Sequence, residues 1–416
     1  MKYSLNLSKF LSNNVKLLYS VTLVFLYIFS FSLPVIKTST ILSFGLALLS
    51  VYIVKYRDIK SLYSSRLIFF NTLSLLFLLF LSFFITFIHA QYDYAISKLI
   101  PTQIIYIFIG GFIAIAIFNV NGRCKNIQTY TKIVAYAFCL QSIIMILATM
   151  SPFVLSFVRL FQPDSVSIIS DRYSGFRGVA LASGQFFSLS VTYGLTIIMF
   201  CIYNLKNDTR LKNIVVTILL SIGVLYAGRT AFISFLILLP FFVSFRFSLT
   251  LVASLKTIFM LFIAGFLVYF LFPTVSKVIV DNVFSYAFEF IYNYIDYGTL
   301  TTSSTDKLHD MYFPIEYGTF LFGDGRFSGI NSAYYMGTDA GYMRTVLFGG
   351  VFFSIILVLI QITYYSKKDM FFYASIIYIL LVNYKGVSTV LLLSIQCLLM
   401  LVAFFNFLCR SDDKHK

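Results

Sequence analysis

The sequence predicts an all-α polytopic membrane protein with about 12 transmembrane helices, each of roughly 20 apolar residues. Three observations support this fold class. Hydrophobic residues make up 59% of the 416 residues, charged residues make up 11%, and the apolar residues form long runs separated by short basic gaps. A soluble domain carries about 25% charged residues. We therefore expect a single integral membrane domain over residues 1–416.

The apolar runs give the expected spans in chain order. These spans cover residues 17–36, 40–54, 67–88, 101–119, 133–150, 181–203, 214–227, 230–245, 254–272, 344–364, 370–383 and 388–408. The first run is long, lacks a small-residue cleavage site and leads into further spans. We therefore expect a retained helix rather than a cleaved signal peptide.

The basic residues predict the orientation of these spans. The net charge is +15, but Lys and Arg gather in short gaps between apolar runs, as topology signals do. This distribution argues against a nucleic-acid partner. With the N-terminus inside, every inner gap is basic, so both termini are expected in the cytoplasm. The inner clusters are Lys55/Arg57/Lys60/Arg66, Arg123/Lys125/Lys132, Lys206/Arg210/Lys212, Lys367/Lys368 and Arg410/Lys414/Lys416.

Two longer polar segments are expected on the outer side, a smaller loop over 151–180 and a large loop over 273–343. In the large loop, apolar and aromatic residues recur at helical spacing over 279–295, which predicts a short helix. The sequence Gly323-Asp324-Gly325 predicts a turn. None of the five cysteines lies in this loop, and no metal-ligand spacing is present. We expect no metal and no cofactor.

Arg229 is the first candidate site residue. Its hairpin, 214–245, is shorter than the roughly 40 residues that two full spans need, so the apex is expected inside the apolar slab. An arginine there costs at least about 2.5 kcal/mol unless it meets water, a partner or an anion. Arg229 is therefore expected either to reach the lipid headgroups or to bind an anion from the outer side.

Arg172 and Arg177 form the second candidate site, in the segment Asp171–Gly178 just before a predicted span. Glycines flank the arginines, so that both backbone and guanidinium groups can approach a ligand. The alternative is an outer loop whose charges lie in water. Arg177 is the more interesting arginine because it lies closer to the membrane.

Asp339 and Arg344 form the third candidate site, at the end of the large loop. If a helix starts here, Asp339 shares a face with Tyr335 and with Met343, and Arg344 enters the membrane one turn deeper. The pair is then either a structural ion pair or helix-terminal charge, or it lines a polar cleft that contacts a substrate.

Two further residues of the large loop are candidate general bases. His309 is expected at a solvated surface position, with a general base as the minority interpretation. Glu316 has the same standing. The three arginine sites share the predicted outer face, and arginines there suit phosphate or pyrophosphate groups. On the outer face of a membrane the available phosphates are mainly lipid-linked.

Three short motifs and the layout resemble one protein family. The motifs are Arg172–Gly178, the Ala-Gly-Arg-Thr-Ala-Phe sequence Ala227–Phe232, and Thr338–Arg344 followed by Phe348-Gly349-Gly350. The spans, the shorter middle loop and the large loop before the last three helices complete the pattern. The chain resembles, over nearly its whole length, the bacterial O-antigen polymerases. These integral membrane glycosyltransferases join lipid-linked repeat units.

This resemblance implies the substrate and the location. The substrate would be an oligosaccharide repeat on undecaprenyl pyrophosphate, polymerised at the periplasmic face of the bacterial inner membrane without a nucleotide sugar, metal or cofactor. The growing chain would move from its lipid pyrophosphate to the free end of a new lipid-linked unit. Membrane lipid and a chain-length regulator protein are further implied partners.

The resemblance also implies residue roles. Arg172, Arg177, Arg229 and Arg344 would bind the pyrophosphate and stabilise its leaving charge. Asp339 would orient or deprotonate the acceptor hydroxyl. His309 and Glu316 compete with Asp339 for the role of base.

Two other functions stay open. O-antigen ligases share this layout but usually carry a His-Asn motif in the large loop. Here Asn331 lacks the preceding histidine, which favours a polymerase, whereas His309 keeps the ligase open. A lipid-linked oligosaccharide flippase is the third function. Transporters commonly show two similar halves and broken helices, and the sequence shows no internal repeat.

Overall fold

The computed structural model describes residues 12–33, 38–50, 56–122, 126–171, 177–205, 211–245, 285–287, 289–299, 301–329 and 334–413. It is 78% helical. Within the described residues, β-structure is limited to one isolated antiparallel bridge between Ser328 and Tyr334. The predicted all-α fold class is therefore confirmed.

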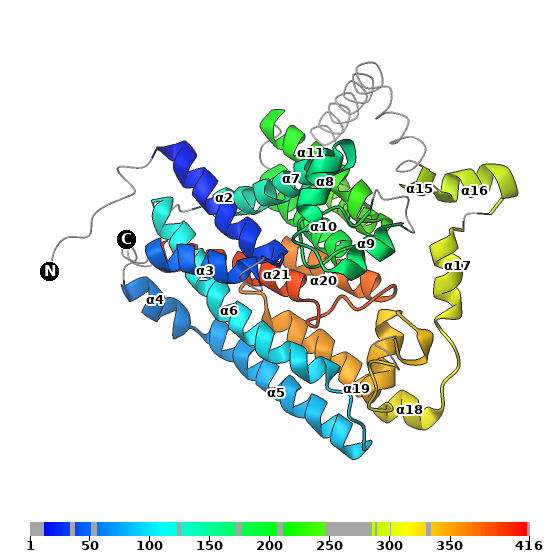
Figure 1. Cartoon of the computed structure of the whole chain (residues 1–416). Coiled ribbons are helices and arrows are strands. Elements are labelled where there is room, and N and C mark those ends of the chain that lie inside the picture. The colour runs from blue at the N-terminus through cyan, green and yellow to red at the C-terminus, as the bar shows by residue number, and fades with distance from the viewer. Residues whose placement is uncertain are drawn as a thin grey trace. The chain divides into compact units, whose positions relative to one another are not determined.

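Figure 1 shows the helices in chain order. They are α2 (Asn13–Phe29), α3 (Ser39–Ser50), α4 (Tyr56–Tyr63), α5 (Arg66–Ile88), α6 (Ala95–Val120), α7 (Ile127–Met150), α8 (Pro152–Arg159), α9 (Asp164–Asp171), α10 (Phe187–Phe200), α11 (Leu211–Ala227), α12 (Ile233–Phe245), α15 (Ser285–Ala287), α16 (Glu289–Tyr297), α17 (Ser303–Asp310), α18 (Tyr317–Phe322), α19 (Gly341–Thr363), α20 (Met370–Asn383) and α21 (Leu393–Asp413). A π-helical turn, Cys201–Leu205, follows α10, and 3-10 turns cover Arg229–Phe232 and Tyr335–Gly337.

Six described helices are long and apolar enough to cross a membrane. They are Arg66–Ile88, Ala95–Val120, Ile127–Met150, Phe187–Asn204, Gly341–Thr363 and Leu393–Arg410. Five shorter apolar helices are Asn13–Phe29, Ser39–Leu49, Leu211–Ala227, Arg229–Pro240 and Met370–Asn383. By these helices the chain is a membrane protein. The predicted span over 254–272 lies outside the described residues. The total of about 12 spans and the outer position of the large loop stay predictions.

Polar residues set several helix starts. Ser65 accepts a hydrogen bond from the backbone N–H of Ile68 at the start of α5, and Asn126 does the same for Gln128 at the start of α7. Asp369 caps α20 through the N–H of Phe372. Such caps satisfy N–H groups that the first turn of a helix leaves without partners.

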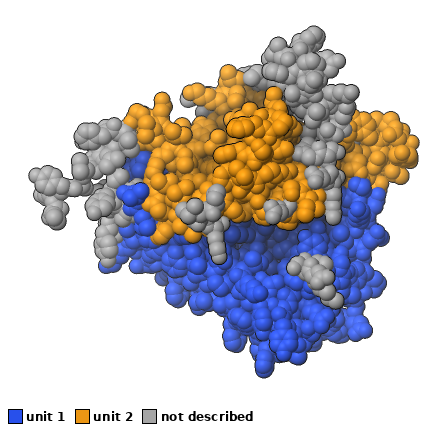
Figure 2. Space-filling view, in the orientation of Figure 1, with its two compact units in different colours: residues 1–10, 47–125, 303–416 blue, residues 11–46, 126–302 orange. Residues whose placement is uncertain are grey.

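The chain forms two compact units, coloured separately in Figure 2. Unit 1 comprises Met1–Phe10, Ala47–Lys125 and Ser303–Lys416, and unit 2 comprises Leu11–Leu46 and Asn126–Thr302. The prediction of a single integral domain stays a prediction.

In unit 1, α6 packs against α5, α21 and α4, and α5 also packs against α19 (Figure 1). Polar side chains join these helices inside the apolar core. Asn71 donates to the carbonyl of Thr363 (3.1 Å) and accepts from the Thr363 hydroxyl (2.9 Å). Gln103 donates to the carbonyl of Val390 (2.7 Å). Hydrogen bonds of this kind help to hold membrane helices together, because an apolar side chain gains little when it leaves lipid for another helix.

In unit 2, α10 is the central helix, and all its residues from Leu189 to Phe200 are buried. It packs against α7, α11 and α12. The Tyr193 hydroxyl hydrogen bonds with that of Ser142 (3.0 Å) and donates to the carbonyl of Phe138 (3.0 Å). The buried helix α10 helps to place a candidate site residue, because Ser190 in its first turn hydrogen bonds to the turn that carries Arg229.

The helix α19 is interrupted at Gly349 and Gly350, whose φ and ψ are −137° and 16°, and 75° and −178°. The second conformation is essentially restricted to glycine. The interruption frees the carbonyls of residues 347–348, which accept hydrogen bonds of 2.7 and 3.0 Å from the backbone N–H groups of residues 324–325. The segment predicted as a turn after α18 therefore caps the first half of α19.

We expect Gly350→Ala to destabilise the fold. A Cβ at Gly350 would lie 2.6 Å from the backbone nitrogen of Phe322 and still closer to the backbone of Leu321, in addition to backbone strain of about 1–3 kcal/mol. The detergent-solubilised variant should unfold several degrees below the wild type in a thermal size-exclusion assay. Gly318→Ala is the matched control, because a Cβ at Gly318 of α18 meets nothing within 4 Å. Equal midpoints for the two variants would contradict this account.

Candidate functional site

Two of the predicted arginines meet in unit 2. Arg177 and Arg229 both lie over the ring of Tyr286, with 4.9 and 4.2 Å between the guanidinium carbon and the ring centroid. Arg177 also donates to the Tyr286 hydroxyl (2.7 Å) and the Ala227 carbonyl (3.0 Å). A guanidinium over an aromatic ring gains about 0.5–2 kcal/mol. We call Arg177, Arg229, Tyr286 and their partner Glu289 the unit 2 centre.

The turn between α11 and α12 places Arg229 in this centre. Gly228 has φ +152°, and a Cβ there would lie 3.0 Å from Nη2 of Arg177. The absence of a side chain at Gly228 therefore leaves room for the guanidinium of Arg177. Ser190, in the first turn of α10, donates to the Gly228 carbonyl (2.7 Å) and accepts from the Ala231 N–H (3.0 Å). The Ala227–Phe232 motif is thus a turn held from both sides.

Arg229 forms an ion pair of 2.5 Å with Glu289, the first residue of α16. The two side chains are 12% and 23% exposed. Glu289 lies 60 residues from Arg229 along the chain. The sequence offered two expectations for Arg229, the headgroup region or an anion. The described structure shows a carboxylate of the chain itself bound to it.

Arg177 lies at the start of a non-helical, largely buried segment, 177–186, that precedes α10. Side chains donate hydrogen bonds to backbone carbonyls of this segment, which in a helix would accept from backbone N–H groups. Ser170 donates to the carbonyl of Arg177 (2.5 Å), and Gln162 donates to that of Gly178 (3.1 Å). Arg177 is 6% exposed, so the alternative, in which its charge lies in water, does not describe its surroundings.

Arg344, in the first turn of α19, is the centre of a second arrangement, in unit 1. Its guanidinium carbon lies 3.9 Å from the ring centroid of Phe327 and 4.4 Å from that of Tyr334. Its Nη2 makes only a long contact, 3.5 Å, with the Phe327 carbonyl. Its Nε is buried and has no hydrogen-bond partner among the described residues. A buried N–H of this kind is a candidate contact for an anionic ligand. We call Arg344, Phe327, Tyr334 and Asp339 the unit 1 centre.

Asp93, between α5 and α6, fixes the backbone that carries Phe327. One carboxylate oxygen accepts from the N–H groups of Phe327 (2.7 Å) and Ser328 (2.5 Å), and the other accepts from that of Ala95 (3.0 Å). The negative charges of Asp93 and Asp339 both act on Arg344. Asp93 therefore positions one of the two rings and balances the arginine.

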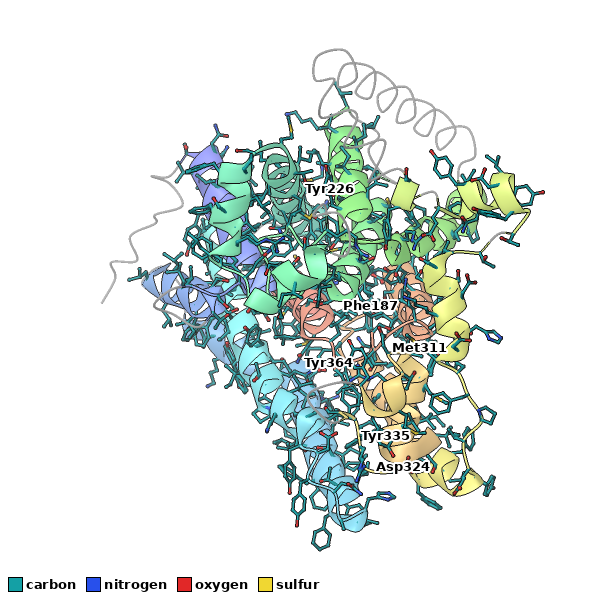
Figure 3. All side chains as sticks on the ribbon, turned by 45° about the vertical axis from the view of Figure 1, so that its right-hand side comes forward. Phe187, Tyr226, Met311, Asp324, Tyr335 and Tyr364 are labelled. Carbon is teal, nitrogen blue, oxygen red and sulfur yellow. The ribbon has the colours of Figure 1, made fainter. Side chains whose placement is uncertain are left out.

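Asp324 connects α18 with the 3-10 turn that contains Tyr335. It accepts from the Thr319 hydroxyl (2.8 Å) and the Tyr335 hydroxyl (3.3 Å), and Figure 3 shows Asp324 and Tyr335 adjacent to each other. The bridge between Ser328 and Tyr334 brings Tyr334 back toward Phe327. The rings of the unit 1 centre are thus placed by hydrogen bonds rather than by one helix.

Asp339 precedes α19, which begins at Gly341. The prediction that Tyr335 and Asp339 share a helix face is therefore wrong. Tyr335 lies in a separate 3-10 turn, where Met336 has φ 52°. Asp339 forms no ion pair with Arg344 among the described residues. Burial raises the pKa of Asp339 above its ordinary value of 3.8, and the charges of Arg344 and Lys385 oppose this shift.

The remaining candidates lie elsewhere. His309 is exposed at the end of α17, while its neighbour Leu308 packs on Ala340 and Met343. This agrees with the solvated interpretation of His309. Glu316 is exposed at the start of α18. Arg172 lies outside the described residues, and of the helix predicted over 279–295 only α15 and α16 are described.

Two acidic residues escaped sequence reasoning, Glu289 and Asp93. Each binds a group far away in the chain, at separations of 60 residues for Glu289 and 234 for Asp93. A usable signal was the scarcity of acids, because Asp and Glu total 16 in the whole chain. Within the described residues, no group of three or more His, Cys, Asp or Glu side chains is placed to hold a metal.

Comparison of the chain with protein-family models, with curated proteins and with solved structures gives no match in any of the three.

We expect Asp339→Asn to leave the protein at least as stable as the wild type at pH 7. The folded protein holds the Asp339 proton more tightly than the unfolded chain, because burial raises its pKa. This carboxyl therefore adds stability below its unfolded pKa, and that stability is lost as pH rises through the folded pKa. Ionised Asp339 thus opposes folding at pH 7.

Thermal unfolding of the detergent-solubilised proteins tests this expectation. Any gain from Asp339→Asn should shrink as pH falls toward about 4, the ordinary carboxyl range. Asp296→Asn is the control, because Asp296 is exposed on α16. A midpoint for Asp339→Asn well below the wild type at pH 7 would show that the attraction to Arg344 outweighs burial.

Proposed function

We propose that this protein is an O-antigen polymerase, which joins undecaprenyl-pyrophosphate-linked oligosaccharide units at the periplasmic face of a bacterial inner membrane. The proposal includes about 12 spans, cytoplasmic termini and a large periplasmic loop over 273–343. The support is that the chain is a helical membrane protein with Arg229 in the turn between α11 and α12 and Arg344 in the first turn of α19.

The observation that carries the proposal is the hydrogen-bonding state of Arg344. Two aromatic rings hold the guanidinium, and its buried Nε–H has no acceptor within the part of the chain that the structure describes. A planar guanidinium edge matches two oxygens of a phosphate. The proposed anion is a lipid-linked pyrophosphate. It reaches a membrane protein through its lipid, and it carries the sugar unit to be polymerised.

The proposed reaction is a glycosyl transfer from a lipid pyrophosphate to an acceptor hydroxyl. The bond between the anomeric carbon of the growing chain and its pyrophosphate oxygen breaks, and the acceptor hydroxyl oxygen bonds to that carbon. Undecaprenyl pyrophosphate leaves with the electron pair, and Arg177, Arg229 and Arg344 are the residues proposed to stabilise pyrophosphate charge. Asp339 takes the hydroxyl proton, since a carboxylate whose pKa is raised is a stronger base.

A flippase for the same lipid-linked unit is the second candidate. The observation that favours it is the interruption of α19 at Gly349 and Gly350, since broken helices are common in transporters. The absence of an internal repeat in the sequence argues the other way. Both candidates use a pyrophosphate site, so the product that accumulates without the protein must decide between them.

Deletion of the gene, complemented with wild type or variants and followed by gels of the surface polysaccharide, tests the function. The deletion should leave lipid A core with a single repeat unit. Unsubstituted core with long lipid-linked polymer would instead indicate a ligase. Unsubstituted core with single lipid-linked units trapped in the cytoplasmic leaflet would indicate a flippase and overturn the proposal.

Arg344→Ala should fail to restore the polymer ladder although the protein is inserted at wild-type levels. Removal of one oxyanion donor typically lowers turnover by about 100-fold or more. Arg344→Lys keeps the charge but loses the planar fork and should restore the ladder only partly. Arg410→Ala, an exposed arginine near the C-terminal end of α21, is the control and should restore it fully. A full ladder with Arg344→Ala would remove Arg344 from the mechanism.

A further inference from the structure

The ion pair between Arg229 and Glu289 has an arrangement that a purely structural pair does not require. Arg229 and Arg177 bring two positive charges to one ring, Tyr286, and the carboxylate of Glu289 is bound to one of them at 2.5 Å. A carboxylate oxygen and a phosphate oxygen are the same kind of acceptor for a guanidinium. Glu289 therefore stands where a ligand oxyanion would bind.

Both partners can be reached by a ligand. The side chains of Arg229 and Glu289 are 12% and 23% exposed, so the pair is partly open rather than sealed. Breaking such a pair is costly only where one charge is left buried without a partner. An incoming anion with more charge than a carboxylate keeps the guanidinium of Arg229 paired while it replaces Glu289.

The helix that carries Glu289 is also weakly anchored. The nine residues of α16, Glu289–Tyr297, include no buried residue. Its large side chains are instead exposed, namely Phe290, Ile291, Tyr292, Tyr294, Ile295 and Tyr297. Elements with few buried apolar contacts separate from the fold at low free-energy cost. Movement of Glu289 away from Arg229 thus exposes no buried side chain of α16 itself.

We propose that Glu289 is an internal competitor for the arginines of the unit 2 centre, displaced when a pyrophosphate group binds Arg229. This inference rests on the proposed function and adds to it a residue that sets the affinity of the site. A competitor within the chain lowers the apparent affinity for every ligand by the ratio of paired to released states. It also assists product release, because the returning carboxylate replaces the departing lipid pyrophosphate.

Titration of inorganic pyrophosphate into the full-length protein in lipid nanodiscs, followed by calorimetry, tests the competition. Glu289→Gln should bind about 3- to 10-fold more tightly than wild type, because the neutral amide competes less for Arg229. Glu289→Asp, with a shorter reach, should lie between the two. Arg229→Ala should lose most of the affinity, and the double variant with Glu289→Gln should show no gain over it.

A general change in charge must be separated from competition. Asp296→Asn removes the same charge from the same helix at an exposed position, seven positions further along the chain, and should leave the affinity unchanged. An equal gain from Asp296→Asn would attribute the effect to the overall field and overturn the inference.

The remaining outcomes separate this inference from the proposed function. Unchanged or weaker binding by both Glu289 variants, with binding still dependent on Arg229, would make Glu289 a structural partner and leave the polymerase proposal in place. No pyrophosphate binding by the wild type or by Glu289→Gln would overturn the inference, and would also count against Arg229 as a pyrophosphate contact.

Discussion

A guanidinium group keeps its charge throughout the physiological pH range, so an arginine enclosed by apolar residues must be matched by rings, carbonyls or anions. This constraint governs both centres. Arg177 uses the Tyr286 hydroxyl and the Ala227 carbonyl, and Arg229 uses Glu289. Arg344 has two rings, and its buried Nε has no acceptor among the described residues. The two centres therefore differ: unit 1 holds a buried guanidinium donor, and unit 2 holds a carboxylate that we propose a ligand replaces.

Backbone geometry supports each arrangement at small residues. The turn at Gly228 leaves room for Arg177, and Ser190 of the buried α10 holds that turn. In unit 1, the interruption at Gly349 and Gly350 supplies the carbonyls to which the segment after α18 attaches. Gly228 belongs to the motif Ala227–Phe232, and Gly349 and Gly350 follow the motif Thr338–Arg344. These glycines explain how the chain can come so close to itself beside the arginines.

The sequence was sufficient to predict the elements that depend on local composition. The predicted spans 67–88 and 133–150 correspond to α5 and α7, because an apolar run of this length has few alternatives to a helix. The predicted span 344–364 corresponds to α19, but the expectation that a helix already places Tyr335 and Asp339 on one face was wrong, since the positive φ of Met336 and Gly337 ends a separate 3-10 turn before α19 begins. The meeting of Arg177 with Tyr286, 109 residues apart, depends on tertiary packing that no local pattern encodes.

The interruption of α19 divides that helix mechanically. The half that carries Arg344 ends in hydrogen bonds to residues 324–325, not in a continuous helical ladder. Phe327 lies two residues after that segment, so the arginine and one of its rings belong to the same hydrogen-bonded body. The ring and the guanidinium are therefore aligned by these local hydrogen bonds and not by the part of α19 that follows Gly350.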